Sequence, residues 1–181
     1  MVAEAVPLGV AAMQDQRALV LTELFTRHGE GLVRLAYCLV GNRELAEEAV
    51  QDAYLSLYRN WKSIRRESSS LAYLRATVIN RCRSDQRRLI KARMSDPLVA
   101  ITESTTVPSS ESWVIARDES SRILAEVCRL PQRQREVVVC RYYLDLSERA
   151  TAELLDISLG SVKRHAHRGL SHLQSRLEEN L

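Results

Sequence analysis

Near the end of the chain, the segment SVKRHAHRGL (Ser161–Leu170) concentrates side chains that could do chemistry. Six consecutive positions, 163–168, hold one lysine, two arginines and two histidines. Imidazoles can bind a metal ion, and closely spaced cations can bind the phosphates of DNA. The same composition also occurs on the solvated face of an ordinary helix. Three hypotheses therefore compete for this segment: a metal site, a DNA-binding surface and a solvated face.

A helical arrangement of this segment separates its apolar residues from its cations. At 100° per residue one side carries the apolar residues Val162, Ala166, Leu170, Leu173 and Leu177. Arg164 and Arg168 lie almost opposite that side. The histidines His165, His167 and His172 share no i, i+4 face, and no cysteine or carboxylate lies nearby at ligand spacing. The metal hypothesis is therefore the weakest of the three.

The residues before this segment favour DNA binding. Ser147 is a typical cap for a short helix, ERATAELL, which ends at Leu155. The turn DIS follows, and Ser158 can cap the next helix. Two helices joined by such a short turn are typical of the helix-turn-helix motif, whose second helix reads DNA.

A second candidate surface lies on a helix predicted over 43–61. Its apolar stripe consists of Ala46, Ala49, Val50, Ala53, Tyr54, Leu57 and Trp61. Glu44, Glu48, Gln51 and Leu55 lie on the other side, with Glu47 and Asp52 at the margins. A leucine among carboxylates favours a partner surface, although single exposed leucines are common. A solvated acidic face is the alternative.

A third candidate surface lies on a helix predicted over 70–91. Its buried stripe consists of Leu71, Leu74, Val78 and Cys82, and the opposite side carries Tyr73, Thr77, Asn80, Ser84 and Arg87, flanked by Arg83 and Arg88. Between positions 81 and 93 there are six basic residues and one acid. This density favours binding of a phosphate backbone, and the amide of Asn80 suits a base edge.

These surfaces belong to two predicted lobes. The segment SDPLVAITESTTVPSSES (95–112) is rich in serine and threonine and shows no sustained period, which is typical of a flexible tether. We predict a flexible tail over 1–16, a helical lobe over 17–93, a linker over 94–117 and a second helical lobe over 118–181. The scarcity of glycine and proline, six and four residues, agrees with an all-α protein.

Composition excludes several classes of protein. An apolar content of 45% supports a packed core. No apolar run approaches the roughly 18 residues of a membrane helix, and the first residues lack the basic leading region of a signal peptide. We therefore expect a cytoplasmic protein without membrane insertion.

The sequence also lacks the motifs of an enzyme. It contains no nucleophile elbow, no glycine-rich phosphate loop and no set of metal ligands. The cysteines form no C-x-x-C pair, so core thiols are favoured over a redox switch: Cys38, Cys82, Cys128 and Cys140. We expect neither catalysis nor a cofactor.

Together these motifs resemble a known family. The segment LPQRQREVVVCRYYLDLSERATAELLDISLGSVKRHAHRGLSHL resembles the fourth conserved region of bacterial RNA polymerase sigma factors of the extracytoplasmic-function (ECF) group. LAYCLVGNRELAEEAVQDAYLSLYRNW, followed by AYLRATVINRCRSDQRR, resembles their second conserved region. The matches cover most of 20–93 and 118–177 in the family's order. One helix-turn-helix is shared by many repressors, whereas both regions together favour a sigma factor.

The resemblance implies a promoter-specificity factor that binds core RNA polymerase, recognises the minus-thirty-five and minus-ten elements, and initiates transcription by stabilising the melted non-template strand. It implies docking on the clamp of the largest polymerase subunit through Glu48, Gln51, Asp52 and Leu55. It implies minus-ten contacts through Tyr73, Thr77, Asn80, Arg83, Arg87 and Arg88, with Asn80 at the pocket for a flipped-out base. It implies minus-thirty-five contacts through Ser161, Lys163, Arg164 and Arg168. The flap of the second-largest subunit and an anti-sigma factor are further implied partners.

Three positions depart from the family pattern: Ser84 and Ala150 replace common acids, and Asp156 replaces a common glycine. These changes bear on promoter preference more than on the fold. The alternative is a stand-alone helix-turn-helix transcriptional regulator whose N-terminal lobe dimerises. It predicts tight binding of a symmetric duplex without polymerase. A small enzyme or thiol redox protein is a second alternative, which predicts a polar constellation in a cleft.

Overall fold

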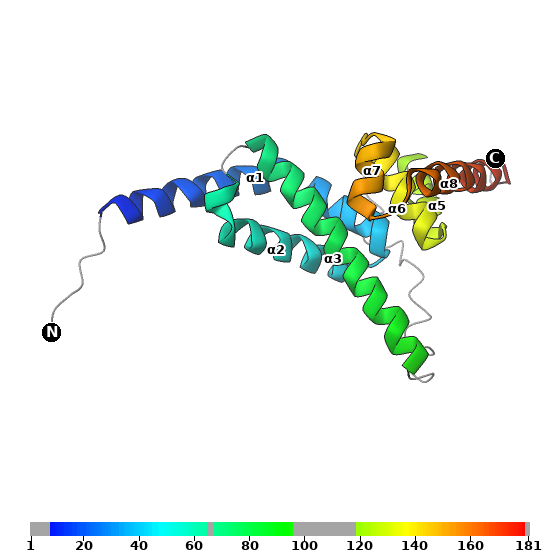
Figure 1. The fold of residues 1–181 in the computed structure, drawn as a ribbon, viewed down its shortest axis with the longest axis horizontal. Helices are drawn as coiled ribbons and strands as arrows, with labels where there is room; N and C mark the ends of the chain where they lie inside the picture. The colour runs from blue at the N-terminus through cyan, green and yellow to red at the C-terminus, as the bar shows by residue number, and fades with distance from the viewer. Residues whose placement is uncertain (1–7, 65–66, 96–118, 180–181) are drawn as a thin grey trace.

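The computed structural model describes residues 8–64, 67–95 and 119–179, and these ranges are helical without a β-strand (Figure 1). The N-terminal lobe comprises α1 (Leu8–Val40), α2 (Arg43–Arg59), the short 3₁₀ helix η1 (Trp61–Ser63) and α3 (Glu67–Ser95). The C-terminal lobe comprises α5 (Glu119–Arg129), α6 (Gln132–Val138), the π-helical η3 (Val139–Tyr143), α7 (Glu148–Leu155) and α8 (Leu159–Glu179). The all-α prediction is confirmed.

Local capping sets several helix boundaries. Gly41 follows α1 with a φ of 72°, the left-handed conformation that glycine adopts without steric cost. Asn42 Oδ1 accepts a hydrogen bond of 3.0 Å from the backbone N–H of Leu45, which caps α2. Ser147 Oγ accepts one of 3.1 Å from the N–H of Ala150, which caps α7. The sequence predicts each of these caps.

The prediction of a flexible tail over 1–16 is wrong from Leu8 onward, because α1 already begins there. Residues 8–16 include two alanines, two glutamines, one leucine and one methionine, which favour helix. Residues 1–7 lie outside the described ranges. The predicted linker, 94–117, also lies outside them, apart from its first two residues, which end α3.

One hydrophobic core runs through both lobes. The N-terminal lobe contributes fully buried residues including Leu35, Leu57, Leu74 and Val78, and the C-terminal lobe contributes Val137, Val139, Leu155 and Val162. The C-terminal lobe packs against α1 through α5, α6 and η3, and polar side chains of α3 also reach it (Figure 1). The start of α1 and the end of α8 lie at opposite ends of the molecule (Figure 1). The lobes are therefore in direct contact in this conformation.

The turn of the helix-turn-helix has the left-handed residue and the helix cap that the sequence predicts. Asp156 ends α7 in the left-handed conformation with a φ of 51°. Ser158 Oγ accepts a 3.2 Å hydrogen bond from the N–H of Ser161, which caps α8. Helix α8 then passes close to α6, because a Cβ added to Gly169 would lie 2.7 Å from Cγ2 of Val138. This close packing fixes which face of α8 is exposed.

The four cysteines are buried and form no disulfide: Cys38, Cys82, Cys128 and Cys140. Burial raises the pKa of three of them, Cys38, Cys82 and Cys140, to about 12. These thiols stay protonated and unreactive at neutral pH while the core remains closed. Within the described ranges, no helix combines the length and apolar character that crossing a bilayer requires.

Candidate nucleic-acid and polymerase interfaces

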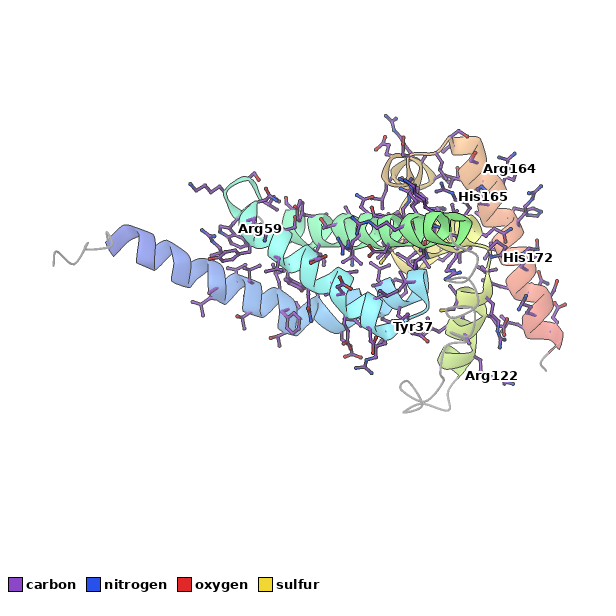
Figure 2. All side chains as sticks on the ribbon, turned by 90° about the horizontal axis from the view of Figure 1, so that it is seen from below. Tyr37, Arg59, Arg122, Arg164, His165 and His172 are labelled. Carbon is purple, nitrogen blue, oxygen red and sulfur yellow. The ribbon has the colours of Figure 1, made fainter. Side chains whose placement is uncertain are left out.

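The outward face of α8 presents the predicted minus-thirty-five residues near its first turns. Arg164 and Arg168 are exposed, and Arg164 can donate a hydrogen bond of 3.4 Å to Ser161 Oγ. Lys163 Nζ lies 3.7 Å from a carboxylate oxygen of Glu148 on α7. Figure 2 shows Arg164 on the first half of α8, with His165 beside it. The helix therefore offers exposed positive charge at the end that a recognition helix inserts into a groove.

His165 belongs to the helix packing rather than to a metal site. Its Nδ1 atom is buried and makes no hydrogen bond. Burial lowers the pKa of His165 below 6.5, and the neighbouring Arg164, Arg133 and Arg168 lower it further. His165 therefore stays neutral beside the cations. Among the described residues, no group of three histidine, cysteine or acidic side chains could hold a metal ion.

The predicted minus-ten residues on α3 differ in exposure. Asn80, Arg87 and Arg88 are exposed, whereas Tyr73 and Thr77 are half-buried. The Tyr73 hydroxyl lies 2.7 Å from Ser56 Oγ and accepts a 3.0 Å hydrogen bond from Asn60 Nδ2, both near the end of α2. The end of α2 therefore fixes the orientation of Tyr73.

Arg83 differs from the exposed phosphate contact that the sequence predicts. Only 7% of the residue is exposed, and its Nη2 donates a 2.7 Å hydrogen bond to the carbonyl oxygen of Leu155 in the C-terminal lobe. Its Nε lies 3.7 Å from a carboxylate oxygen of Glu136, which is also buried. Burial lowers the pKa of the guanidinium, and Glu136 opposes that effect. In this conformation Arg83 joins the lobes and does not face solvent.

The predicted polymerase-docking residues form one face of α2. Gln51 is exposed, and Leu55 is 52% exposed although it is apolar. The side chains of Glu48 and Asp52 lie 3.4 Å and 3.2 Å from Arg81 on α3. The acidic face is therefore held against the same helix that carries Asn80.

Arg81 is a residue that sequence reasoning did not single out. Besides the two carboxylates of α2, it contacts Asp85 on its own helix at 3.2 Å. The Asp85 contact follows i, i+4 spacing and could be found from the sequence. The contacts across to α2 depend on how the helices pack, so no sequence period reveals them.

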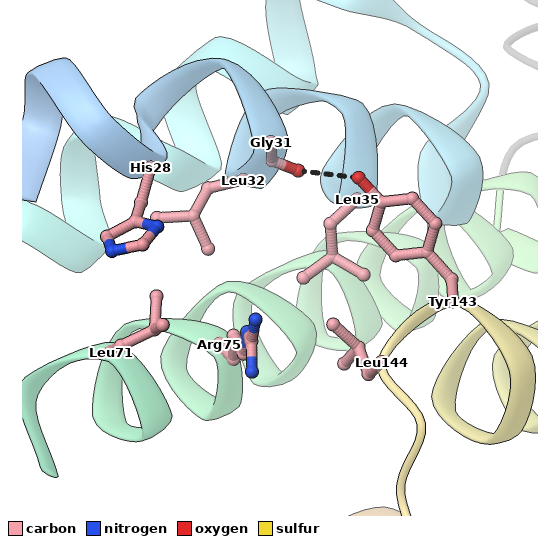
Figure 3. A pocket seen from close by; sticks show the side chains of 8 residues that line it. All are labelled: His28, Gly31, Leu32, Leu35, Leu71, Arg75, Tyr143 and Leu144. Atoms are coloured by element: carbon pink, nitrogen blue, oxygen red, sulfur yellow. Dashed lines mark hydrogen bonds between the residues drawn. The ribbon is translucent and has the colours of Figure 1, made fainter. Parts of the chain in front are cut away.

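A cavity of about 170 Å³ lies where the lobes meet (Figure 3). Its walls come from α1, α3 and the end of η3, and its lining residues are His28, Gly31, Leu32, Leu35, Leu71, Arg75, Tyr143 and Leu144. The Tyr143 hydroxyl donates a 3.2 Å hydrogen bond to the carbonyl oxygen of Gly31, as Figure 3 shows. None of these lining residues belongs to the three candidate surfaces.

Comparison with known proteins places both lobes in one family. Residues 24–91 match the family model of sigma-70 region 2, and residues 120–173 match that of sigma-70 region 4. The chain is 31% identical to the ECF RNA polymerase sigma factor SigW of Bacillus subtilis over 160 residues, covering 82% of this chain and 83% of SigW. It is also 31% identical to the ECF RNA polymerase sigma factor SigM of Mycobacterium tuberculosis, covering 83% of this chain and 74% of SigM.

A solved structure has the same overall fold. The sigma factor RpoE of Bartonella quintana, in complex with the anti-sigma factor NepR, matches with a TM-score of 0.65 and 18% identity. The match covers 92% of this chain and 97% of RpoE. Fold and sequence therefore define a DNA-binding transcription protein of the sigma class. Within it, the chain belongs to the ECF RNA polymerase sigma factors.

Proposed function

We propose that this chain is a promoter-specificity factor that directs core RNA polymerase to minus-thirty-five and minus-ten elements and stabilises the melted non-template strand. The observation that carries the proposal is the arrangement of three surfaces on two lobes of the ECF family. These surfaces are the acidic face of α2, the basic half of α3 and the exposed cations of α8.

Each surface suits one step of initiation. Helix α8 enters the major groove of the minus-thirty-five element, where Ser161, Lys163 and Arg164 contact bases and adjacent phosphates and Arg168 binds phosphate. Asn80 reads an unpaired base of the minus-ten element. Unstacking that base costs a few kcal/mol, which pocket and phosphate contacts offset.

The remaining minus-ten residues bind the backbone of the single strand. Arg87 and Arg88 are exposed and can neutralise phosphates directly. Tyr73 and Thr77 line the same helix, and Arg83 becomes a phosphate contact once it is released from the C-terminal lobe. The strand therefore runs along α3 from Tyr73 to Arg88.

The acidic face of α2 docks on the clamp of the largest polymerase subunit. Glu48, Gln51 and Asp52 suit a basic partner, and the exposed Leu55 supplies an apolar contact at the centre. The flap of the second-largest subunit receives the C-terminal lobe. By analogy with the RpoE–NepR complex, an anti-sigma factor is a further partner. The chain acts in the cytoplasm as a binding protein without catalysis.

Run-off transcription on a promoter library tests the proposal. Purified core polymerase is compared with and without the full chain, and the new start sites are mapped by sequencing. We expect start sites that require the chain and that share two elements upstream. Core polymerase that neither binds the chain nor gains start sites would contradict the proposal. A palindromic duplex bound by the chain alone would favour a stand-alone regulator instead.

A further inference from the structure

We propose that the C-terminal lobe closes over α3 in the free chain and occupies Arg83, so that the lobe and the minus-ten strand compete for the same arginine. This inference rests on the proposed function, because it assigns the strand to α3. Neither the family matches nor the relatives' names describe such a contact.

The contact has a buried ion pair at its centre. Glu136 on α6 is only 1% exposed and forms the ion pair with Arg83. Its carboxylate also accepts hydrogen bonds from Gln132 at 2.9 Å and from Arg133 at 3.0 Å. Arg83 crosses from α3 to reach both this carboxylate and the carbonyl of Leu155. A DNA phosphate cannot reach a guanidinium that is enclosed in this way, so contact between Arg83 and the strand requires the lobes to separate.

A belt of further hydrogen bonds surrounds the ion pair. Gln132 donates a 2.6 Å hydrogen bond to Gln86 Oε1, which links α6 to α3. Arg135 donates one of 3.0 Å to the carbonyl of Leu39 in the last turn of α1, and Gln86 also donates to that carbonyl. A carbonyl in the last turn of a helix lacks a helical partner and attracts cations. The closed contact is therefore specific, and each lobe satisfies polar groups of the other.

The same contact can open reversibly. Water can solvate the polar groups of the belt when the lobes part, and a buried ion pair adds little net stability because its desolvation cost is large. Arg164 and Arg168 on α8 stay exposed in the closed form. Closure therefore removes Arg83 from the α3 surface and leaves the cations of α8 available.

Alkylation of a native thiol measures the opening of the full chain. Cys128 on α5 is buried against α1, where its Sγ contacts the carbonyl oxygen of Tyr37 at 3.8 Å, and burial raises its pKa. Iodoacetamide therefore reaches Cys128 when the lobes separate. The rate for each cysteine is read by peptide mass spectrometry. Cys82, on the α3 stripe of Leu74 and Val78, reports global unfolding.

Glu136→Gln removes the charge that holds Arg83 and keeps the side-chain shape. We expect Cys128 to react about tenfold faster in this variant, with Cys82 unchanged. Gln132→Ala, which removes the hydrogen bonds of Gln132 to Gln86 and Glu136 but keeps the ion pair, should give a smaller increase of about threefold. Glu153→Gln is the matched control, because it breaks an exposed ion pair with Arg149 on α7 of the same lobe. It should leave both rates unchanged.

Anisotropy of a labelled single-stranded DNA of mixed sequence tests the competition itself. Glu136→Gln should bind the strand about fivefold more tightly than the unmodified chain, because Arg83 is released to a phosphate. The double variant Glu136→Gln, Arg83→Ala should lose that gain. A gain that persists without Arg83 would overturn the competition.

Equal Cys128 rates in Glu136→Gln, Gln132→Ala and Glu153→Gln would overturn the closed state. If Cys82 reacts faster in Glu136→Gln, that variant has unfolded. The Cys128 rate of Gln132→Ala then shows whether the lobes open or not. Transcription in the promoter-library assay together with unchanged rates would refute only this inference. A chain that opens as expected but supports no transcription would instead refute the proposed function.

Discussion

The two basic surfaces, on α3 and on α8, have similar composition but opposite surroundings. The cations Arg164 and Arg168 of α8 face solvent, while Arg83 of α3 lies between the lobes against Glu136. Arg87, four residues after Arg83, stays exposed. On α3 the central cation contacts the neighbouring lobe, whereas the cations nearer the end of the helix stay exposed. A basic helix can therefore divide its cations between an internal contact and its outer surface.

The largest effect should come from removing the buried arginine of α3. Arg83→Met leaves the Glu136 carboxylate buried without its inter-lobe partner, which should destabilise the chain by about 3 kcal/mol. Arg87→Met, an exposed neighbour on the same helix, should change stability by less than about 0.5 kcal/mol. Urea unfolding followed by circular dichroism measures both. Equal losses of unfolding free energy in the two variants would contradict the difference between the buried Arg83 and the exposed Arg87.

On α8, the exposed cation should matter for DNA and not for stability. Arg164→Ala should lower transcription from a promoter with an intact minus-thirty-five element by roughly tenfold, because a base contact contributes about 1–3 kcal/mol. Its unfolding midpoint should stay unchanged. Arg149→Ala is the control, since Arg149 is exposed on the neighbouring helix α7 and pairs with Glu153 on the same helix. A loss of the same size in Arg149→Ala would show that charge alone matters.

The exposure of the α8 face depends on its close approach to α6. Gly169→Ala places a methyl group against Val138 and should destabilise the chain by about 1–2 kcal/mol. Gly160→Ala is the matched change in the same helix, and its added Cβ meets no atom within 4 Å. It should stabilise the chain by about 0.5–1 kcal/mol. Thermal unfolding of both variants checks the opposite signs.

The smallest effect should be a pH dependence from His165. Its pKa lies below 6.5 in the folded chain, so the unfolded chain binds the proton first as the pH falls. Its contribution to stability is therefore fully present above pH 6.5 and is lost as the pH falls through the lowered pKa. His165→Gln should show a shallower loss of the unfolding free energy below pH 6.5. Parallel pH profiles for both proteins would contradict this assignment.

Local chemistry made much of the fold predictable. The caps Asn42 and Ser147 and the turn residues Gly41 and Asp156 act within a few residues, so the sequence alone indicates them. The helical period likewise indicates the buried and exposed sides of α2 and α8. Helix α5 was not predicted as a separate element, although Leu124 and Val127 have helical spacing.

The candidate site was predictable only where it depends on one helix. The exposure of Leu55 and Arg164 follows from a single helical wheel. The burial of Arg83 and the contacts of Arg81 depend on neighbouring helices that are distant in sequence. A basic residue can bind either a phosphate or a buried carboxylate. Residue type alone therefore does not show whether the side chain is exposed to DNA or buried in an ion pair.

Matched promoter changes test most directly the central claim that each lobe reads one promoter element. Asn80→Ala and Arg164→Ala are each assayed by run-off transcription with core polymerase on an intact promoter and on promoters altered in one element. The account predicts that the Asn80→Ala defect disappears when the minus-ten element is already altered and persists when the minus-thirty-five element is altered. Arg164→Ala should show the reverse pattern. Two variants that lose activity through the same element would contradict the account.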